Sequence, residues 1–311
     1  MSMIEKIMRN EKKCKRFFGL SNRQIDALVK RLEPLWSESE KNRLSRINRQ
    51  RAIGGGRQYA QGALNEMVLA CLLYYKLYLT QEFTGALFGV DQSTVSRIIS
   101  RLSTIIARAA DPELENMFQR TESIKKHCIK NFVELQEACP DLADLMTDAS
   151  ETTCNRPKDY DIQKKFYSGK QKAHTIKTQI TINSDKRIMA VSESYPGSVH
   201  DKRIFDSDGT IKKIPPQARH MLDKGYIGVD RENPDANILI PFKKRPGQNA
   251  LPDWAKQINK FISRRRVSVE HVIGKVKNFR ICSYTYRGRR ENFNQIFKNI
   301  AALYNFCHAT A

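Results

Sequence analysis

Three acidic residues stand where carboxylates from distant parts of the chain could act together. Asp148 ends a strand predicted over residues 142–149, and Asp223 follows a short strand predicted over 219–222. Glu270 lies inside a long helix predicted over 253–279. Functional side chains gather where the strands of an α/β sheet end. The two aspartates are therefore expected to converge, and a helix crossing the same edge would supply the glutamate.

Three hard oxygen ligands, without a suitable His pair or a CxxC pair, are a set that Mg²⁺ or Mn²⁺ prefers. Two such ions, held a few ångströms apart, would activate a water or a 3′-hydroxyl and stabilise the leaving oxygen in phosphodiester displacement. The alternative is that these acids face solvent or pair with lysine, because the chain contains 33 acidic residues. Spacing alone leaves both interpretations open.

The helix around Glu270 is otherwise basic, with the sequence RRRVSVEHVIGKVK. Arg266, Glu270 and Lys277 are separated by four and seven residues, so they share one helix face. Glu270 is either an ion-pair partner of Arg266 or a metal ligand with cations beside it that hold DNA phosphates.

The composition favours a nucleic-acid partner. Lys and Arg total 54 of 311 residues, and the formal net charge is +21. Residues 1–150 carry +5 of this charge and residues 151–311 carry +16. So positive a field attracts polyanions through counterion release, although a solvated basic surface is the alternative. No apolar run is long enough to span a membrane, and no secretory signal is evident. Seven Cys, an odd number, argue against a disulfide framework. A cytoplasmic protein is expected, nucleoid-associated if bacterial.

A helix-turn-helix is predicted at about residues 80–101, in the sequence LTQEFTGALFGVDQSTVSRIISRL. Thr80 would cap a short helix through Phe88, Gly89-Val90 would form the turn, and Asp91 would cap the second helix. An ordinary helical hairpin is the alternative. The exposed side of the second helix, which would contact DNA, is predicted to carry Gln92, Ser93, Thr94, Ser96 and Arg97.

The N-terminal part is predicted to be helical, with a capping box at Ser21 and Gln24 and a helix end at Pro34. Gly54–Gly56 predict a loop. From residue 141 the pattern changes to a strand, a basic loop over 155–173, a hairpin over 175–195, a helix, two strands and two long helices. This order predicts a mixed α/β layer. Trp36 and Trp254 are expected to be packing residues.

Several segments in this order resemble those of DDE transposases of the bacterial insertion-sequence-five family and their Harbinger relatives. The resemblance runs from about Arg49 to Phe306 and rests on RAIGGGRQ, LYLTQEFTGALFGVDQSTVSRI, TDASE, RPKDY, YSGKQKAHTIKTQI, YPGSVHD, LDKGY, IPFKK and RRRVSVEHVIGKVKNFRI. The family's signature Tyr-x2-Arg-x3-Glu-x6-Lys is matched at Arg266, Glu270 and Lys277. Ser263 stands at the Tyr position.

The resemblance implies an RNase-H-like catalytic core after an N-terminal helix-turn-helix. The expected division is a helical DNA-binding region over 1–110, a helical linker over 111–140 and the catalytic domain over 141–311. Asp148, Asp223 and Glu270 would be the catalytic acids and would hold two Mg²⁺ or Mn²⁺ ions. Asp201, in PGSVHD, is an alternative second acid, but helix capping explains it and a strand end favours Asp223.

The expected activity is metal-dependent cleavage at the terminal repeats of a mobile element, followed by strand transfer into target DNA. Lys224, Arg266 and Lys277 would contact phosphates, and a homo-oligomer is expected because two ends must be brought together. The alternatives are a DNA-binding regulator derived from an inactive or domesticated transposase, and a stand-alone DNA endonuclease.

Overall fold

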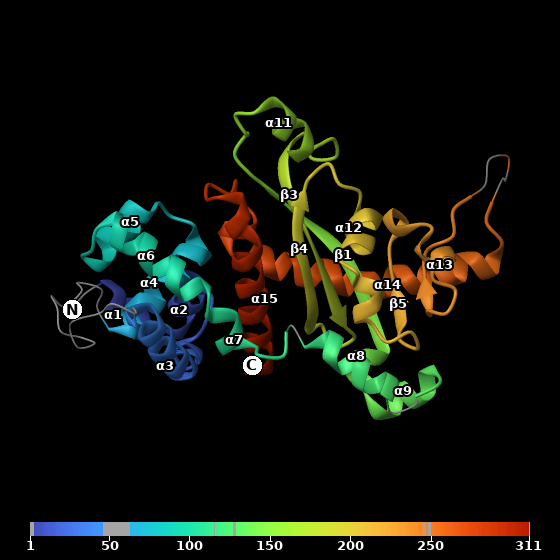
Figure 1. Ribbon diagram of the computed structural model, residues 1–311, viewed down its shortest axis with the longest axis horizontal. Coiled ribbons are helices and arrows are strands. Elements are labelled where there is room, and N and C mark those ends of the chain that lie inside the picture. The colour runs from blue at the N-terminus through green and yellow to red at the C-terminus, as the bar shows by residue number, and fades with distance from the viewer. Residues whose placement is uncertain are drawn as a thin grey trace. The chain divides into compact units, whose positions relative to one another are not determined.

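The computed structural model describes residues 3–45, 63–114, 116–126, 129–244, 247 and 250–310. Its residues divide into two compact units (Figure 1). The helical unit comprises Met1–Pro112, Lys277–Tyr284 and Lys298–Ala311, and the α/β unit comprises Glu113–Val276 and Thr285–Phe297. This division differs from the one expected at residues 110 and 140, since two C-terminal segments pack with the N-terminal helices. The predicted glycine loop at Gly54–Gly56 lies outside the described residues.

The helical unit is built around one fully enclosed helix, α4. All residues of α4 from Met67 to Tyr75 are buried. A helix that is apolar on every side must be surrounded by other elements, and α2, α3, α5 and α6 all contact α4. The helices of this unit are α1 Met3–Met8, α2 Glu11–Phe18, α3 Asn22–Leu44, α4 Leu64–Leu77, α5 Gln81–Phe88, α6 Gln92–Ser103 and α7 Ile106–Ala110, with part of α15 Phe293–Ala309.

The start of α3 was predicted correctly and its end was not. Ser21 and Gln24 form the expected capping box. Pro34, however, lies inside α3, which continues to Leu44. A proline in a helix removes one backbone hydrogen bond, and the remaining turns of this 23-residue helix keep theirs. The prediction that Pro34 ends the helix was therefore wrong.

The α/β unit holds one mixed sheet with the strand path β4-β3-β1-β5-β6, to which β2 adds beside β3. Neighbours β1, β3 and β4 are antiparallel, and β5 and β6 run parallel to β1. This is the expected mixed α/β layer of an RNase-H-like core. The strands are β1 Asp144–Thr153, β2 Tyr167–Ser168, β3 Ala173–Asn183, β4 Ile188–Pro196, β5 Arg219–Met221 and β6 Ile238–Leu239.

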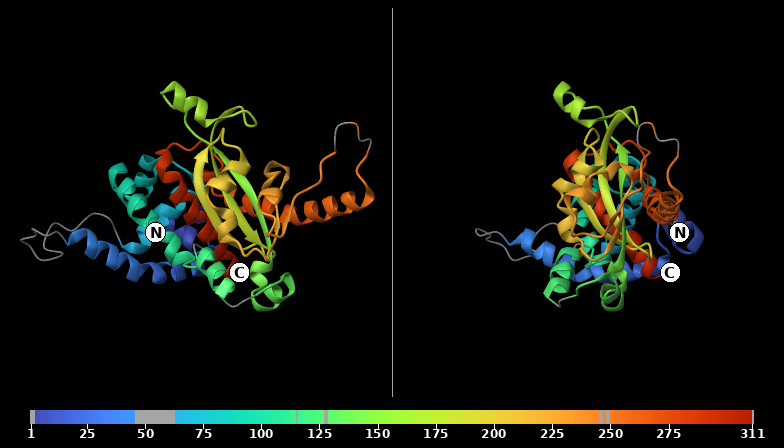
Figure 2. Two further views of the ribbon diagram at one scale, coloured as in Figure 1. Left: turned by 45° about the vertical axis from the view of Figure 1, so that its right-hand side comes forward. Right: turned by 90° about the vertical axis from the view of Figure 1, so that its right-hand side faces the viewer.

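Helices cover the sheet and connect its strands (Figure 2). They are α8 Met117–Lys126, α9 Phe132–Ala138, α10 Pro140–Ala143, α11 Tyr160–Phe166, α12 Asp201–Ser207, α13 Val229–Glu232 and α14 Asp253–Lys277, with 3₁₀ turns η1 Thr210–Lys213, η2 Lys224–Tyr226 and η4 Arg290–Asn292. A further 3₁₀ turn, η3 Arg280–Cys282, belongs to the helical unit, where it contacts α4. The segment 155–173 is not wholly a loop. Asp159 caps α11 by accepting a hydrogen bond from the Ile162 amide, and β2 follows directly.

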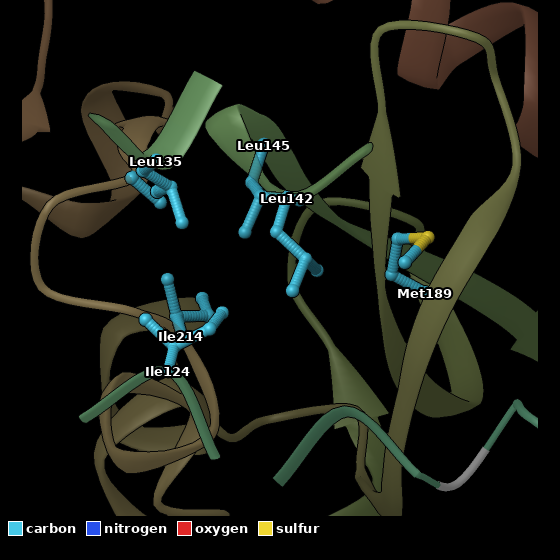
Figure 3. Close-up of a cluster of buried hydrophobic side chains, with 7 residues drawn as sticks. Ile124, Leu135, Leu142, Leu145, Met189 and Ile214 are labelled. Carbon is cyan, nitrogen blue, oxygen red and sulfur yellow. The ribbon is translucent and has the colours of Figure 1, made fainter. Parts of the chain in front are cut away.

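One apolar cluster joins the sheet to the helices that precede it in the chain. Ile124, Leu135, Leu142, Leu145, Met189 and Ile214 gather there with Ala218 (Figure 3). Each is at most 5% exposed, and burial of a side chain of this size contributes roughly 1.5–3 kcal/mol. This cluster fixes the start of β1, and thereby the position of Asp148 further along the strand. Within the described residues, no helix combines the length and the hydropathy needed to cross a membrane.

Candidate active site

Asp148 and Asp223 stand side by side because their strands are parallel neighbours in register. The last residue pair between β1 and β5 is Met146 with Met221. Each aspartate lies two residues beyond its methionine. Side chains alternate between the two faces of a sheet, so a two-residue step returns to the same face. The backbone at Asp223 is still extended, with φ −89° and ψ −177°, and both carboxylates therefore project from one face.

The two aspartates lie in different kinds of backbone structure, one in a strand and the other in a turn. β1 does not end at Ala149 as predicted, because it pairs with β3 as far as Thr153, and Asp148 is thus a mid-strand residue. Asp223 lies in a tight turn, where its Oδ1 accepts a 2.6 Å hydrogen bond from the Gly225 amide. A Cβ on Gly225 would lie only 2.8 Å from that oxygen. The sequence Asp-x-Gly is therefore what allows this carboxylate to fold back on its own turn.

Arg266 of α14 links the two aspartates to Glu270. Its Nη2 nitrogen lies 3.0 Å from Asp148 Oδ2, 3.9 Å from Asp223 Oδ2 and 3.6 Å from Glu270 Oε1. The four-residue spacing places Glu270 one turn after Arg266 on the same face of α14. The predicted acids are therefore arranged around a single cation. The side chain of Glu270 is 56% exposed and those of Asp148 and Arg266 are 18% and 19% exposed.

Burial and charge act in opposite directions on Asp148. Burial raises the pKa of its carboxyl group, and the nearby Arg266 guanidinium opposes that rise. The Nε of Arg266 is buried without a hydrogen-bond partner in the structure. A buried charge that is incompletely paired costs free energy. The centre of the site is therefore held by electrostatic attraction rather than by a complete hydrogen-bond network.

The donor set suits a hard divalent cation, since all three acids offer oxygen. Among the residues that the structure describes, no three His, Cys, Asp or Glu side chains form a ready-made metal site. The cationic Nη2 of Arg266 lies within 4 Å of all three acids. The residues thus fit an Mg²⁺ or Mn²⁺ site in their chemistry, and binding there would require Arg266 to move away.

Asp201 does not act as a helix cap, contrary to the prediction. It is the first residue of α12, whose N-cap, His200, makes no capping hydrogen bond. The Asp201 carboxylate instead accepts a 3.1 Å hydrogen bond from Lys177 Nζ. Its Oδ2 would lie 3.3 Å from a Cβ on Gly225, so Asp201 borders the turn that holds Asp223.

Two buried residues behind these acids were not predicted as part of the site. Lys177 of β3 is 9% exposed, and its Nζ donates to the Val199 carbonyl and to Asp201 and lies 3.5 Å from Glu151. Tyr226 is fully buried, and its hydroxyl accepts a hydrogen bond from Gln179. For Lys177, the available sequence signal was a lysine inside an apolar strand. For Tyr226, it was the tyrosine of the segment LDKGY.

The remaining predicted phosphate contacts lie in different surroundings. Lys224 is exposed in the turn directly after Asp223. Lys277 is the last residue of α14, is half-buried and belongs to the helical unit. Their contact with phosphates stays a prediction.

The predicted helix-turn-helix is formed by α5 and α6 in the helical unit. Thr80 caps α5 by accepting a hydrogen bond from the Phe83 amide, and Gly89 ends it at φ 67°. The Val90 amide donates to the Gly85 carbonyl, and a Cβ on Gly85 would collide with the Val90 carbonyl oxygen. Glycine is therefore required where the turn closes on α5. Asp91 occupies the N-cap position of α6 without a side-chain capping bond.

Four of the five residues predicted on the outer side of α6 are accessible. Gln92, Ser93 and Arg97 are exposed, and Ser96 is half-buried. Thr94 is only 7% exposed, so its predicted place on the exposed side was wrong. It lies one turn before Ile98 on the apolar face. The Arg97 guanidinium folds back onto its own helix and donates to Ser93 and Thr94.

Comparison with known protein families agrees with both units. The family model of DDE superfamily endonucleases matches residues 147–305. The model of the helix-turn-helix of DDE superfamily endonucleases matches residues 63–112. Since the first match covers half of the chain, the chain belongs to the DDE superfamily of endonucleases. The expected family, helix-turn-helix and fold are thereby confirmed.

Two curated proteins are similar over most of the chain. A probable transposase for insertion sequence element IS702 from Microchaete diplosiphon is 29% identical over 243 residues, which cover 78% of this chain and 80% of that protein. A putative transposase for insertion sequence element IS112 from Streptomyces albus G is 25% identical over 266 residues, which cover 85% of this chain and 83% of that protein. No solved structure matches significantly.

Proposed function

We propose that this protein is the transposase of an insertion sequence, which binds the ends of its element and cleaves and joins DNA there. The observation that carries the proposal is the convergence of Asp148, Asp223 and Glu270 around Arg266, in a chain of the DDE endonuclease superfamily. The two curated relatives bear the names of insertion-sequence transposases, which supports the same conclusion.

In this proposal the three acids hold two Mg²⁺ or Mn²⁺ ions, which when bound activate the attacking oxygen and stabilise the leaving oxygen. Asp148 supplies its carboxylate from β1, Asp223 supplies the second from the turn after β5, and Glu270 supplies the third from α14. Arg266 turns from the carboxylates toward a DNA phosphate. Its guanidinium then neutralises charge on the strand, as does Lys224 beside Asp223.

The helix-turn-helix supplies recognition of the ends in this proposal. Gln92 and Ser93 lie at the start of α6, which is the part of a recognition helix that approaches base edges. Arg97 would exchange its contacts within α6 for a phosphate. Transposition joins two ends to one target, so the active complex is proposed to contain two or more copies of the chain.

The test is a cleavage and strand-transfer assay on DNA carrying the terminal repeats of the element, with Mg²⁺ and with EDTA. Metal-dependent cutting at the ends followed by joining is expected. The matched variants are Asp148→Asn and Asp161→Asn, because Asp161 is an exposed acid in the first turn of α11 and is not one of the three proposed ligands. Binding without cutting by the unmodified protein would indicate a DNA-binding regulator, and cutting without joining would indicate an endonuclease. Full activity of Asp148→Asn would refute the proposed site.

A further inference from the structure

Phe242 and Trp254 form an aromatic pair on the surface of the α/β unit. Phe242 is 40% exposed and Trp254 is 57% exposed. Their ring centroids are 5.1 Å apart and the rings are tilted by 80°, which is an edge-to-face contact. The expectation that Trp254 is a packing residue was therefore wrong, since most of the indole remains outside the core.

Asn259 of α14 fixes the backbone of Phe242 beside Trp254. The side chain of Asn259 accepts a 2.8 Å hydrogen bond from the Phe242 amide and donates a 3.0 Å bond to the Phe242 carbonyl. Trp254 lies in the first turn of α14. The two rings thus come from a strand-following segment and a helix that are tied together, and little ordering would be needed for a ligand to bind them.

The charge around the pair is almost entirely positive. From Phe242 to Arg266 the sequence contains eight basic residues and a single acid, Asp253. Lys243 and Lys244 follow Phe242 and are exposed. Asp253 is neutralised by Lys256 at 2.9 Å. An apolar protein partner would meet exposed lysines here, whereas a polyanion that carries flat aromatic groups would match both features.

Trp254 of the pair and Glu270 of the carboxylate site lie on the same helix but on different sides of it, because the sixteen residues from Trp254 to Glu270 turn α14 by about 160°. The N-terminal part of α14 extends away from the sheet (Figures 1 and 2). Trp254 precedes Glu270 by sixteen residues, which is about 24 Å along a helix. Exposed Lys260 and Arg264 lie between them on α14. This distance corresponds to roughly seven nucleotide steps of a DNA strand at 3.4 Å per step.

We propose that Phe242 and Trp254 form a stacking platform for an unpaired nucleobase of DNA that is bound by the basic residues around the pair. Bases inside a duplex are covered on both faces by their neighbours, so an unpaired base offers its face to the platform much more readily. The position of the DNA relative to Glu270 rests on the proposed function. The stacking itself depends only on the two rings and the basic residues around them.

The intrinsic fluorescence of Trp254 tests this directly. The chain contains two tryptophans, and a Trp36→Phe variant leaves Trp254 as the only one. The probes are a blunt duplex and the same duplex with a single-stranded thymine overhang, each with a labelled end whose anisotropy reports binding. Stacking on thymine is expected to quench Trp254 by about half with the overhang and much less with the blunt duplex. Binding by anisotropy with equal or absent quenching would overturn the proposal.

Affinity gives the second measurement. Trp254→Ala is expected to weaken binding of the overhang duplex by about tenfold, because one stacked base is worth about 1–3 kcal/mol. Trp254→Phe should recover most of this loss, and the affinity for blunt duplex should not change. Tyr160→Ala is the matched control, because Tyr160 is 67% exposed and also lies beside a lysine, Lys164. An equal loss with Tyr160→Ala would refute a specific platform.

These measurements separate the platform from the proposed function. They need no cleavage and are made without metal on the Asp148→Asn background. If DNA binds and is cut by the unmodified protein but Trp254 shows no preference for unpaired bases, the platform alone is wrong. If the protein binds neither DNA, both proposals fail.

Discussion

Arg266 of α14 lies 3.0 Å from Asp148 of β1, although 118 residues separate them in the chain. The same guanidinium nitrogen also forms ion pairs with Asp223 and Glu270. Arg266 thus balances in the free protein the negative charge that a divalent cation would balance in the working site.

Arg266→Gln tests this competition between the guanidinium and a metal ion. The variant should bind Mn²⁺ about tenfold more tightly than the unmodified protein when no DNA is present, since a competing charge contact of about 1.4 kcal/mol is removed. Isothermal titration calorimetry measures the affinity. The double variant Asp148→Asn/Arg266→Gln is the control, and should lose the gain. Equal Mn²⁺ affinity of Arg266→Gln and the unmodified protein would show that Arg266 does not compete.

Glu270→Gln should separate catalysis from stability. The side chain is 56% exposed, so the free energy of unfolding should change by less than about 0.5 kcal/mol. Cleavage of end-containing DNA should fall by about 10³-fold, as for other groups that act on the transition state. Thermal unfolding and single-turnover cleavage give the two numbers, with Asp161→Asn as the exposed-acid control. If Glu270→Gln unfolds at a clearly lower temperature than the unmodified protein, Glu270 contributes to the stability of the fold.

The stability of the α/β unit should decrease in mild acid because of His220. This side chain is buried against Thr147, and burial lowers the pKa of its imidazole from 6.5 to about 3. Between these values the unfolded chain takes up a proton that the folded chain does not, so this stability is complete above pH 6.5 and is lost as the pH falls. From pH 7 to pH 5 the loss is about 2 kcal/mol.

Denaturant unfolding of the unmodified protein and of His220→Gln at several pH values measures this effect. The difference between the two pH profiles isolates His220. Parallel profiles would mean that the imidazole is protonated or accessible in the folded protein.

Gly85→Ala should destabilise the helix-turn-helix. The added methyl group meets the Val90 carbonyl, and overpacking of this kind costs about 1–3 kcal/mol. Gly274→Ala in α14 is the matched control, since nothing lies within 4 Å of its added Cβ. It should raise stability by about 0.5–1 kcal/mol, because alanine favours helix. Thermal unfolding distinguishes the two variants. If Gly85→Ala leaves the stability unchanged, α5 can shift against the turn to make room for the methyl group.

Gln92→Ala and Thr94→Ala should have opposite kinds of effect. Gln92 is exposed at the start of α6, so its loss should weaken binding of the element's ends by about 1–3 kcal/mol without a change in stability. Thr94 is buried, so its loss should lower stability first. Fluorescence anisotropy on specific and scrambled DNA, together with thermal unfolding, measures both. A Gln92→Ala variant with unchanged affinity would argue against base contact by this residue.

Local sequence patterns predicted the elements well because each has its own signal. Polar caps and glycines marked α5 and α6, and alternating residues marked β3. The convergence of Asp148 and Asp223 followed from strand ends, although β1 is longer than its apolar residues indicate, since pairing with β3 extends it. Thr94 was misplaced because polarity suggested exposure, whereas packing of α6 decided its burial.

Contacts between residues that are distant in the sequence could not be predicted from local patterns. Helix periodicity placed Arg266 and Glu270 on one face, but the contact of Arg266 with Asp148 depends on how α14 crosses the sheet. Asp201 looked like a helix cap from its position alone, and Lys177, which binds it, lies on strand β3, distant in the sequence from α12. Nothing in the composition of residues 298–311 indicates that they pack with the N-terminal helices.

That last arrangement bears on how the protein is made. Asn299 bonds to Ser103 and Ala107, and Asn305 bonds to Asp111, so α15 fastens helices made some 200 residues earlier. Domains usually fold in the order in which they leave the ribosome. Here the helical unit is complete only once α15 has been synthesised, so a nascent chain can complete the sheet before the unit that carries the helix-turn-helix.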